Sequence, residues 1–271
     1  MASEPTHTTL VAEQVRREMS GEARALIEAA RADGLTLRLL GGLGVREHCR
    51  TAQLCARDYT DLDMIAPAKQ ARRLPRLFAR FGYHENSDVA TATGNAQLQF
   101  VRPCRHDGEP AGAAAHRDDH VDVFLDTFRM DHDIALARRL ELEPFSISLS
   151  DLLLTKLQIF RANDKDLHDI VTLLEGAEVS DGDASGTVDA RYIARLCADD
   201  WGLFHDVVMN LQRVDERVGR FDLSDDQLAR VRRGLLRLIA AIDVAPRSLR
   251  FRLRAQVGTR ANWHNELDDQ E

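Results

Sequence analysis

The order of hydrophobic and polar residues changes about halfway along this chain of 271 residues. Between residues 35 and 126, short apolar or alternating runs predict β-strands at 35–40, 61–66, 97–100 and 120–126. A further strand is expected within Ile134 to Leu140. Helical spacing over residues 10–32 predicts a first helix, and Pro67 is typical of the first turn of another that runs to Phe81. This half is therefore predicted to be a sheet with flanking helices.

After Ser148 the pattern predicts helices throughout. Ser148 and Asp151 have the spacing of a helix-capping box, and Asn163 begins a second predicted helix. Further helices are expected at 190–198, 201–218 and 224–242, with a loop between Val179 and Thr187. The expected fold class is α+β. Residues 1–148 would hold the mixed sheet and its helices, and residues 149–271 would form an all-helical C-terminal domain.

Two aspartates one residue apart, Asp61 and Asp63, carry the chemistry of the first half. Successive side chains of a strand point to opposite faces, so these two carboxylates would share one face. Their like charges repel each other unless a proton or a cation is shared between them. Oxygen-only ligands of this kind suit a hard divalent ion such as Mg²⁺. The pair therefore predicts a magnesium site.

The glycine pair Gly41 and Gly42 comes before the acids, and a third acid follows on the strand at 120–126. Glycines let backbone N–H groups approach phosphate oxygens closely. Two metal ions about 3.5–4 Å apart would clamp the attacking and leaving oxygens of an in-line displacement. Asp122 would complete the site and help to deprotonate an acceptor hydroxyl, although Asp126 lies on the same strand face. This combination predicts nucleotidyl transfer.

Three short runs, in this order along the chain, resemble the polymerase-beta-like nucleotidyltransferase superfamily: Gly41-Gly42, Thr60-Asp61-Leu62-Asp63 and Val121-Asp122-Val123. The chain is most similar to the branch containing aminoglycoside nucleotidyltransferases and abortive-infection nucleotidyltransferase toxins, over residues 35–175. The resemblance implies that both glycines contact the nucleotide phosphates. It also implies that Asp61 and Asp63 bind metal, with Asp122 as the third carboxylate. Asp126 is then expected to be a strand-end cap or a supporting residue.

Three further residues are predicted to bind the nucleotide. Arg57 and Thr60 lie where members of the family carry Arg-x-x-Thr or Arg-x-Thr before the acid pair. Lys156 falls within an apolar stripe on a helical projection, where an ammonium needs a partner or a route to water. It is expected to reach the triphosphate; the alternative is a lysine that snorkels from the edge of the stripe. Asp166 and Asp169 are expected to support this helix rather than to bind metal.

Composition and charge bear on the expected partners, the cellular location and the state of the cysteines. A formal net charge of −8 argues mildly against a protein whose affinity comes mainly from phosphate backbones. No apolar stretch is long enough to cross a bilayer, and a cytoplasmic protein is expected. The four cysteines form no CxxC pair and are expected to be free thiols. The histidines and Cys104 in and beside residues 103–119 lack the tight spacing of a zinc site, so this stretch is predicted to be an exposed loop.

The resulting prediction is a metal-dependent nucleotidyltransferase. It would move a nucleoside monophosphate from a nucleoside triphosphate such as ATP to an acceptor hydroxyl or phosphate, with two Mg²⁺ ions. A small-molecule acceptor fits the surplus of carboxylates. The first alternative is a toxin-like enzyme that modifies tRNA, which the arginines of the C-terminal region would bind. The second is a non-catalytic interaction module that retains the fold.

Overall fold

The computed structural model describes residues 7–51, 54–56, 61–103, 119–182 and 184–265. The chain divides into two compact units. Unit 1 comprises Met1–Leu43, Asp58–Thr127 and Ala135–Ser146, and unit 2 comprises Gly44–Arg57, Phe128–Ile134 and Ile147–Glu271. The last junction lies close to the break expected near residue 148, but two earlier segments also belong to unit 2.

Unit 1 is built on a five-stranded mixed sheet with the strand order β1-β2-β5-β4-β3. The strands are β1 (Arg38–Leu39), β2 (Leu62–Ala66), β3 (His84–Asn86), β4 (Gln97–Arg102) and β5 (Asp119–Leu125). β2 and β5 run parallel, whereas the other neighbouring pairs are antiparallel. The predicted α+β class with a mixed sheet is confirmed.

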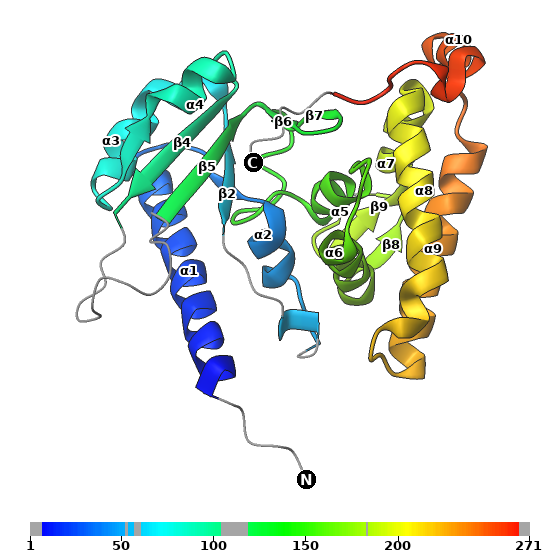
Figure 1. The fold of residues 1–271 in the computed structure, drawn as a ribbon, viewed down its shortest axis with the longest axis horizontal. Helices are drawn as coiled ribbons and strands as arrows, with labels where there is room; N and C mark the ends of the chain where they lie inside the picture. The colour runs from blue at the N-terminus through cyan, green and yellow to red at the C-terminus, as the bar shows by residue number, and fades with distance from the viewer. Residues whose placement is uncertain (1–6, 52–53, 57–60, 104–118, 183, 266–271) are drawn as a thin grey trace. The chain divides into compact units, whose positions relative to one another are not determined.

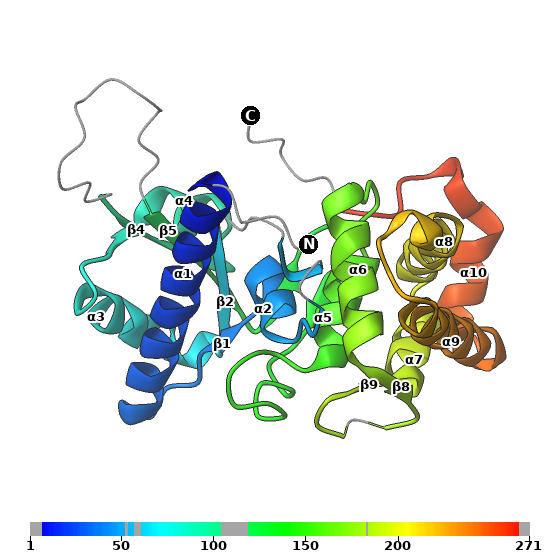
Figure 2. The same cartoon turned by 90° about the horizontal axis from the view of Figure 1, so that it is seen from below.

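One face of this sheet forms the core of unit 1 (Figures 1 and 2). Met64, Val123 and Phe100, from three neighbouring strands, are fully buried with Leu26 of α1 (His7–Ala32) and Phe78 of α3 (Leu74–Ala79). Side chains alternate along a strand, so the residues next to Met64, Val123 and Phe100 in their strands point to the opposite face of the sheet. That opposite face carries the predicted acids.

Shorter elements complete unit 1. The helix predicted from Pro67 begins as a 3₁₀ turn, η2 (Ala68–Arg73), before α3, and α4 (Ser87–Ala92) connects β3 to β4. The strand expected within 134–140 is shorter and earlier, and its sheet lies mostly in unit 2: β7 (Asp133–Ala135) pairs with β6 (Thr127–Arg129), and turns follow.

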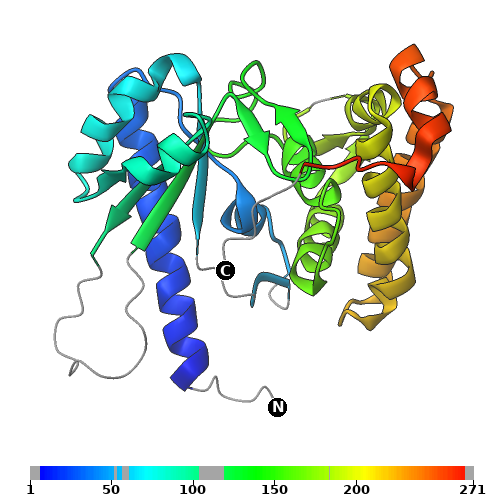
Figure 3. The ribbon, with the colours of Figure 1, turned by 45° about the horizontal axis from the view of Figure 1, so that its top comes forward.

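Unit 2 is mainly helical (Figures 1 and 3). Its helices are α5 (Leu149–Leu157), α6 (Asp164–Gly176), α7 (Ala190–Asp199), α8 (Trp201–Arg217), α9 (Asp225–Val244) and α10 (Leu249–Val257), with 3₁₀ turns η1 (Leu54–Ala56), η3 (Val218–Arg220) and η4 (Gly258–Arg260). The predicted starts are confirmed, because Ser148, Asn163 and Ser224 each cap a helix through the side-chain oxygen. The expected loop at 179–187 instead lies between two short parallel strands, β8 (Glu178–Ser180) and β9 (Thr187–Asp189).

The expectation of free thiols is wrong for two of the cysteines. Cys49 and Cys55 form a disulfide with a Cα–Cα distance of 5.8 Å, which is within the usual range. The turn after α2 (Gly41–Glu47) brings them together, and Arg46 donates a hydrogen bond of 2.6 Å to the Cys55 carbonyl. Cys197 is a buried free thiol, whose pKa burial raises to about 12, and Cys104 lies outside the described residues.

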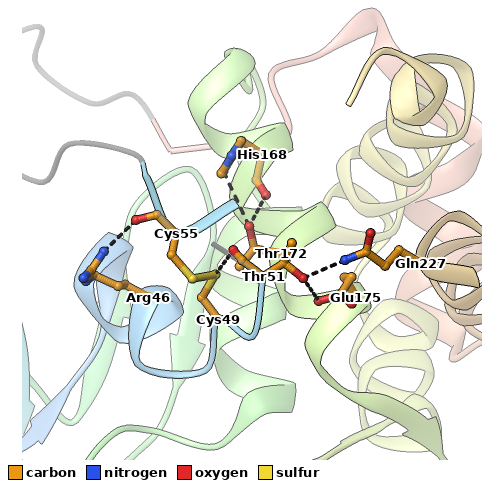
Figure 4. Close-up of a disulfide and its surroundings, with 8 residues drawn as sticks. All are labelled: Arg46, Cys49, Thr51, Cys55, His168, Thr172, Glu175 and Gln227. Carbon is orange, nitrogen blue, oxygen red and sulfur yellow. Dashed lines mark hydrogen bonds between the residues drawn. A yellow bond between two sulfur atoms is a disulfide. The ribbon is translucent and has the colours of Figure 1, made fainter. Parts of the chain in front are cut away.

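The same loop explains why residues 44–57 belong to unit 2 (Figure 4). Thr51 donates a hydrogen bond of 2.9 Å to Glu175 of α6 and accepts one of 2.8 Å from Gln227 of α9. Leu54 is 3% exposed. The disulfide thus closes a loop that already forms hydrogen bonds with α6 and α9 of unit 2. Hydrophobic periodicity in the sequence does not reveal these contacts.

A buried carboxylate anchors the last described segment of unit 2. Asp206 is fully buried and meets Nε2 of His132 at 2.7 Å, Nδ1 of His205 at 3.0 Å and the Trp263 indole N–H at 3.0 Å. Burial acts to raise the pKa of Asp206, but the hydrogen bonds with these three side chains outweigh it and lower the pKa.

None of the helices in the described part of the chain is both long enough and apolar enough to span a membrane.

Candidate functional site

Register places two of the predicted acids on one face of the unit 1 sheet. β2 and β5 pair in parallel so that Asp63 lies directly beside Asp122. The strand begins at Leu62, so Asp61 lies immediately before β2, where its Oδ1 is 3.6 Å from Nε2 of His120 on β5. The side chains of Asp61 and Asp122 are 53% and 16% exposed, so the first is open to solvent and the second is enclosed. Asp63 and Asp122 therefore share one face, and Asp61 lies at the start of the same pair of strands.

Two more polar residues join this group, and neither was predicted. His120, two residues before Asp122 on β5, places Nε2 at 3.6 Å from Oδ1 of Asp61 and 3.8 Å from Oδ2 of Asp122. Gln99 of β4 donates a hydrogen bond of 3.1 Å from Nε2 to Oδ1 of Asp122. The strand alternation of residues 97–100 and 120–126 was a usable signal for both, but only pairing between the strands shows that they converge.

Gly41 supports Asp63 through a close approach that only glycine allows. Its φ is +67°, and a Cβ added to it would lie 2.0 Å from Oδ2 of Asp63. The preceding residue, Leu40, donates its N–H to the Asp63 carbonyl at 3.0 Å. Gly41 and Gly42 open α2, so the predicted glycine turn is a strand-to-helix turn lying against the acid strand.

Asp126 has the supporting role that was expected of it. It directly follows β5 with φ +61°, and its Oδ1 accepts a hydrogen bond of 3.0 Å from the N–H of Ala68. Its own N–H donates to the Ala66 carbonyl at 3.0 Å. This carboxylate therefore caps the turn between β2 and η2, and the prediction is confirmed.

The structure does not place the other three predicted nucleotide-binding residues beside the acids. Arg57 and Thr60 lie outside the described residues. Lys156 belongs to α5 of unit 2, where Nζ lies 3.0 Å from Oδ2 of Asp169 and 3.8 Å from Oδ1 of Asp166. Both acids come from α6, which agrees with the supporting role expected of them. A contact between Lys156 and a nucleotide stays a prediction.

Lys156→Ala is expected to lower the free energy of unfolding by about 3–5 kcal/mol. Removing the lysine takes away the cation that compensates the buried carboxylate of Asp169. Asp169 is fully buried, so its carboxylate would lose this cation without gaining water. Chemical denaturation measures the change. Lys165→Ala, at an exposed lysine of α6, is the control and is expected to stay within about 0.5 kcal/mol of wild type. Equal unfolding midpoints for the two variants would show that the ion pair contributes little.

The donor set suits a hard divalent cation. The carboxylates of Asp61, Asp63 and Asp122 offer only oxygen, which is the ligand type of Mg²⁺. In the conformation described, no group of three or more His, Cys, Asp and Glu side chains among the described residues is gathered closely enough to hold a metal ion. The acids thus offer suitable oxygen ligands at neighbouring positions, but they do not form a closed metal cage.

Comparison with known proteins adds little to this geometry. No protein-family model and no curated protein matches the chain. Among solved structures, the chain is similar to an antigenic nucleotidyltransferase-like protein from Paracoccidioides brasiliensis, with a TM-score of 0.44 and 10% identity. The match covers 79% of this chain and 93% of that chain. A similarity of this size carries no argument about activity.

Proposed function

We propose that this protein is a metal-dependent nucleotidyltransferase that moves a nucleoside monophosphate from a nucleoside triphosphate to an acceptor hydroxyl or phosphate. The observation that carries the proposal is the alignment of Asp63 with Asp122 on neighbouring parallel strands, with Asp61 just before β2 and 3.6 Å from His120 of β5. Like charges placed this close repel one another, and a bound cation would offset that repulsion.

Asp61, Asp63 and Asp122 would hold Mg²⁺. When bound, the metal would supply charge neutralisation at the attacking and leaving oxygens of an in-line displacement. Asp122 would also accept the proton of the acceptor hydroxyl. Gly41 would keep the Asp63 carboxylate in place, and the turn at Gly41 and Gly42 would offer backbone N–H groups to the phosphates. Arg57, Thr60 and Lys156 would add cationic and hydroxyl contacts to the nucleotide.

A small-molecule acceptor fits the charges better than RNA does. The RNA alternative rested on the arginines of the C-terminal region, but Arg230 forms an ion pair with Glu175, Arg237 lies 4.0 Å from Glu178 and Arg250 lies 3.5 Å from Asp200. Arginines already paired with carboxylates attract phosphate less strongly, because binding an anion has to compete with the existing pair. With a net charge of −8, a small acceptor is the better proposal.

The test is transfer of label from each of the four nucleoside triphosphates, labelled at the α-phosphate. The purified protein would be incubated with Mg²⁺ and a cell extract, and small solutes would be separated from RNA. We expect one or more nucleotides to label a small solute and release pyrophosphate. Label in RNA would favour the tRNA-modifying alternative. No transfer from any nucleotide would favour a non-catalytic module.

A further inference from the structure

A row of four polar residues crosses the sheet at the level of the acids. Asn86 of β3 pairs with Gln99 of β4, Gln99 pairs with Asp122 of β5, and Asp122 pairs with Asp63 of β2. Residues paired in this way point to the same face, so all four side chains lie on the face that carries the acids. Leu98 and Phe100, the neighbours of Gln99, are buried in the core on the other face.

Two side-chain hydrogen bonds run along this row in one direction. Nδ2 of Asn86 donates to Oε1 of Gln99 at 2.8 Å, and Nε2 of Gln99 donates to Oδ1 of Asp122 at 3.1 Å. Because Asn86 supplies a donor, the Gln99 amide is turned with its oxygen toward Asn86 and its nitrogen toward Asp122. Asn86 is itself oriented, since its Oδ1 accepts from the N–H of Asp88 as the cap of α4.

The hydrogen bond from Gln99 matters for what Asp122 can bind. It engages Oδ1, whereas the other oxygen, Oδ2, is the one that lies 3.8 Å from His120. An amide donor is neutral, so it orients the carboxylate and leaves its negative charge in place. An arginine or lysine at this position would neutralise that charge. Partners of this kind behind a metal-ligating carboxylate fix its orientation and strengthen metal binding.

We propose that Gln99, oriented by Asn86, is a positioning residue that holds the Asp122 carboxylate ready for a divalent cation. This inference rests on the proposed function, since it takes Asp122 as a metal ligand. It adds that the affinity of the site for the cation is set in part by two neutral side chains on β3 and β4. Neither of them would touch the metal.

The test is direct binding of Mn²⁺, followed by the loss of the free Mn²⁺ signal in electron paramagnetic resonance. Gln99→Leu removes the donor and keeps a side chain of similar length. It is expected to weaken Mn²⁺ binding by about 10-fold or more, the usual effect of losing a partner behind a ligand. The control is Gln97→Leu, on the same strand face two residues away, which is expected to bind Mn²⁺ as wild type does.

A second variant separates orientation from simple packing. Asn86→Asp keeps an oxygen that can cap α4 but can no longer donate to Gln99. The Gln99 amide would then turn its nitrogen toward the new carboxylate and its oxygen toward Asp122. We expect Mn²⁺ affinity to fall by a factor similar to that for Gln99→Leu, with thermal unfolding close to that of wild type.

The measurements also separate this inference from the proposed function. Wild-type protein that binds no Mn²⁺ would overturn both. Wild-type binding that is lost in Asp63→Asn but unchanged in both Gln99→Leu and Asn86→Asp would overturn only the positioning role. If transfer is established, excess Mg²⁺ should restore the rate of Gln99→Leu toward that of wild type, because saturation compensates for weaker binding. Failure of excess Mg²⁺ to do so would count against a role in metal affinity.

Discussion

Asp63→Asn is expected to reduce nucleotidyl transfer by about 10³-fold or more, since the charge stabilisation that a bound metal supplies amounts to several kcal/mol. Asparagine has nearly the shape of aspartate, so the close contact with Gly41 is preserved. The backbone hydrogen bond from Leu40 to the carbonyl of residue 63 does not depend on the side chain. The variant therefore removes the negative charge and keeps these two contacts.

Its folding stability gives an independent check. Removing one of three neighbouring carboxylates relieves repulsion, so the free energy of unfolding without metal should be equal to or above that of wild type. The matched control is Asp126→Asn, at the strand-end acid that caps Ala68. That control is expected to keep its transfer activity. Asp63→Asn that retained a tenth or more of the wild-type rate would rule out the assigned role.

Gly41→Ala is expected to cause the second-largest loss, about 10²-fold in transfer, which is the effect of misplacing a reacting group by about 1 Å. The new methyl group would lie 2.0 Å from Oδ2 of Asp63, so the carboxylate has to move away. The backbone adds strain, because a φ of +67° costs a residue with a Cβ about 1–2 kcal/mol.

The chain offers a control that separates these two effects. Gly34 has the same φ of +67°, but nothing lies within 4 Å of a Cβ added there. Gly34→Ala should therefore show a similar backbone cost in thermal unfolding and unchanged transfer. If both alanine variants lost activity equally, backbone strain rather than contact with Asp63 would be responsible. If Gly41→Ala stayed fully active, the Asp63 carboxylate would not need its described position.

Local sequence rules were sufficient for much of this protein. The apolar run after Asp61 predicted β2, which forms over Leu62–Ala66, and hydrophobic alternation predicted β4 and β5. Side-chain caps at Ser148, Asn163 and Ser224 marked the helix starts, because a cap depends on residues within one turn. These features depend on neighbours in the chain, so the order of residues contains the information.

Pairing between distant segments decided the rest. Strand alternation left Asp122 and Asp126 on the same face, and the parallel register of β2 with β5 is what placed Asp122 beside Asp63. The antiparallel register of β4 with β5 placed Gln99 beside Asp122. Nε2 of His120 on β5 lies 3.6 Å from Oδ1 of Asp61, and Lys156 pairs with Asp169 of α6. Such contacts join residues more than ten positions apart, and no local period encodes them. The sequence thus supplied the chemical groups and their faces, whereas the tertiary structure chose which of them meet.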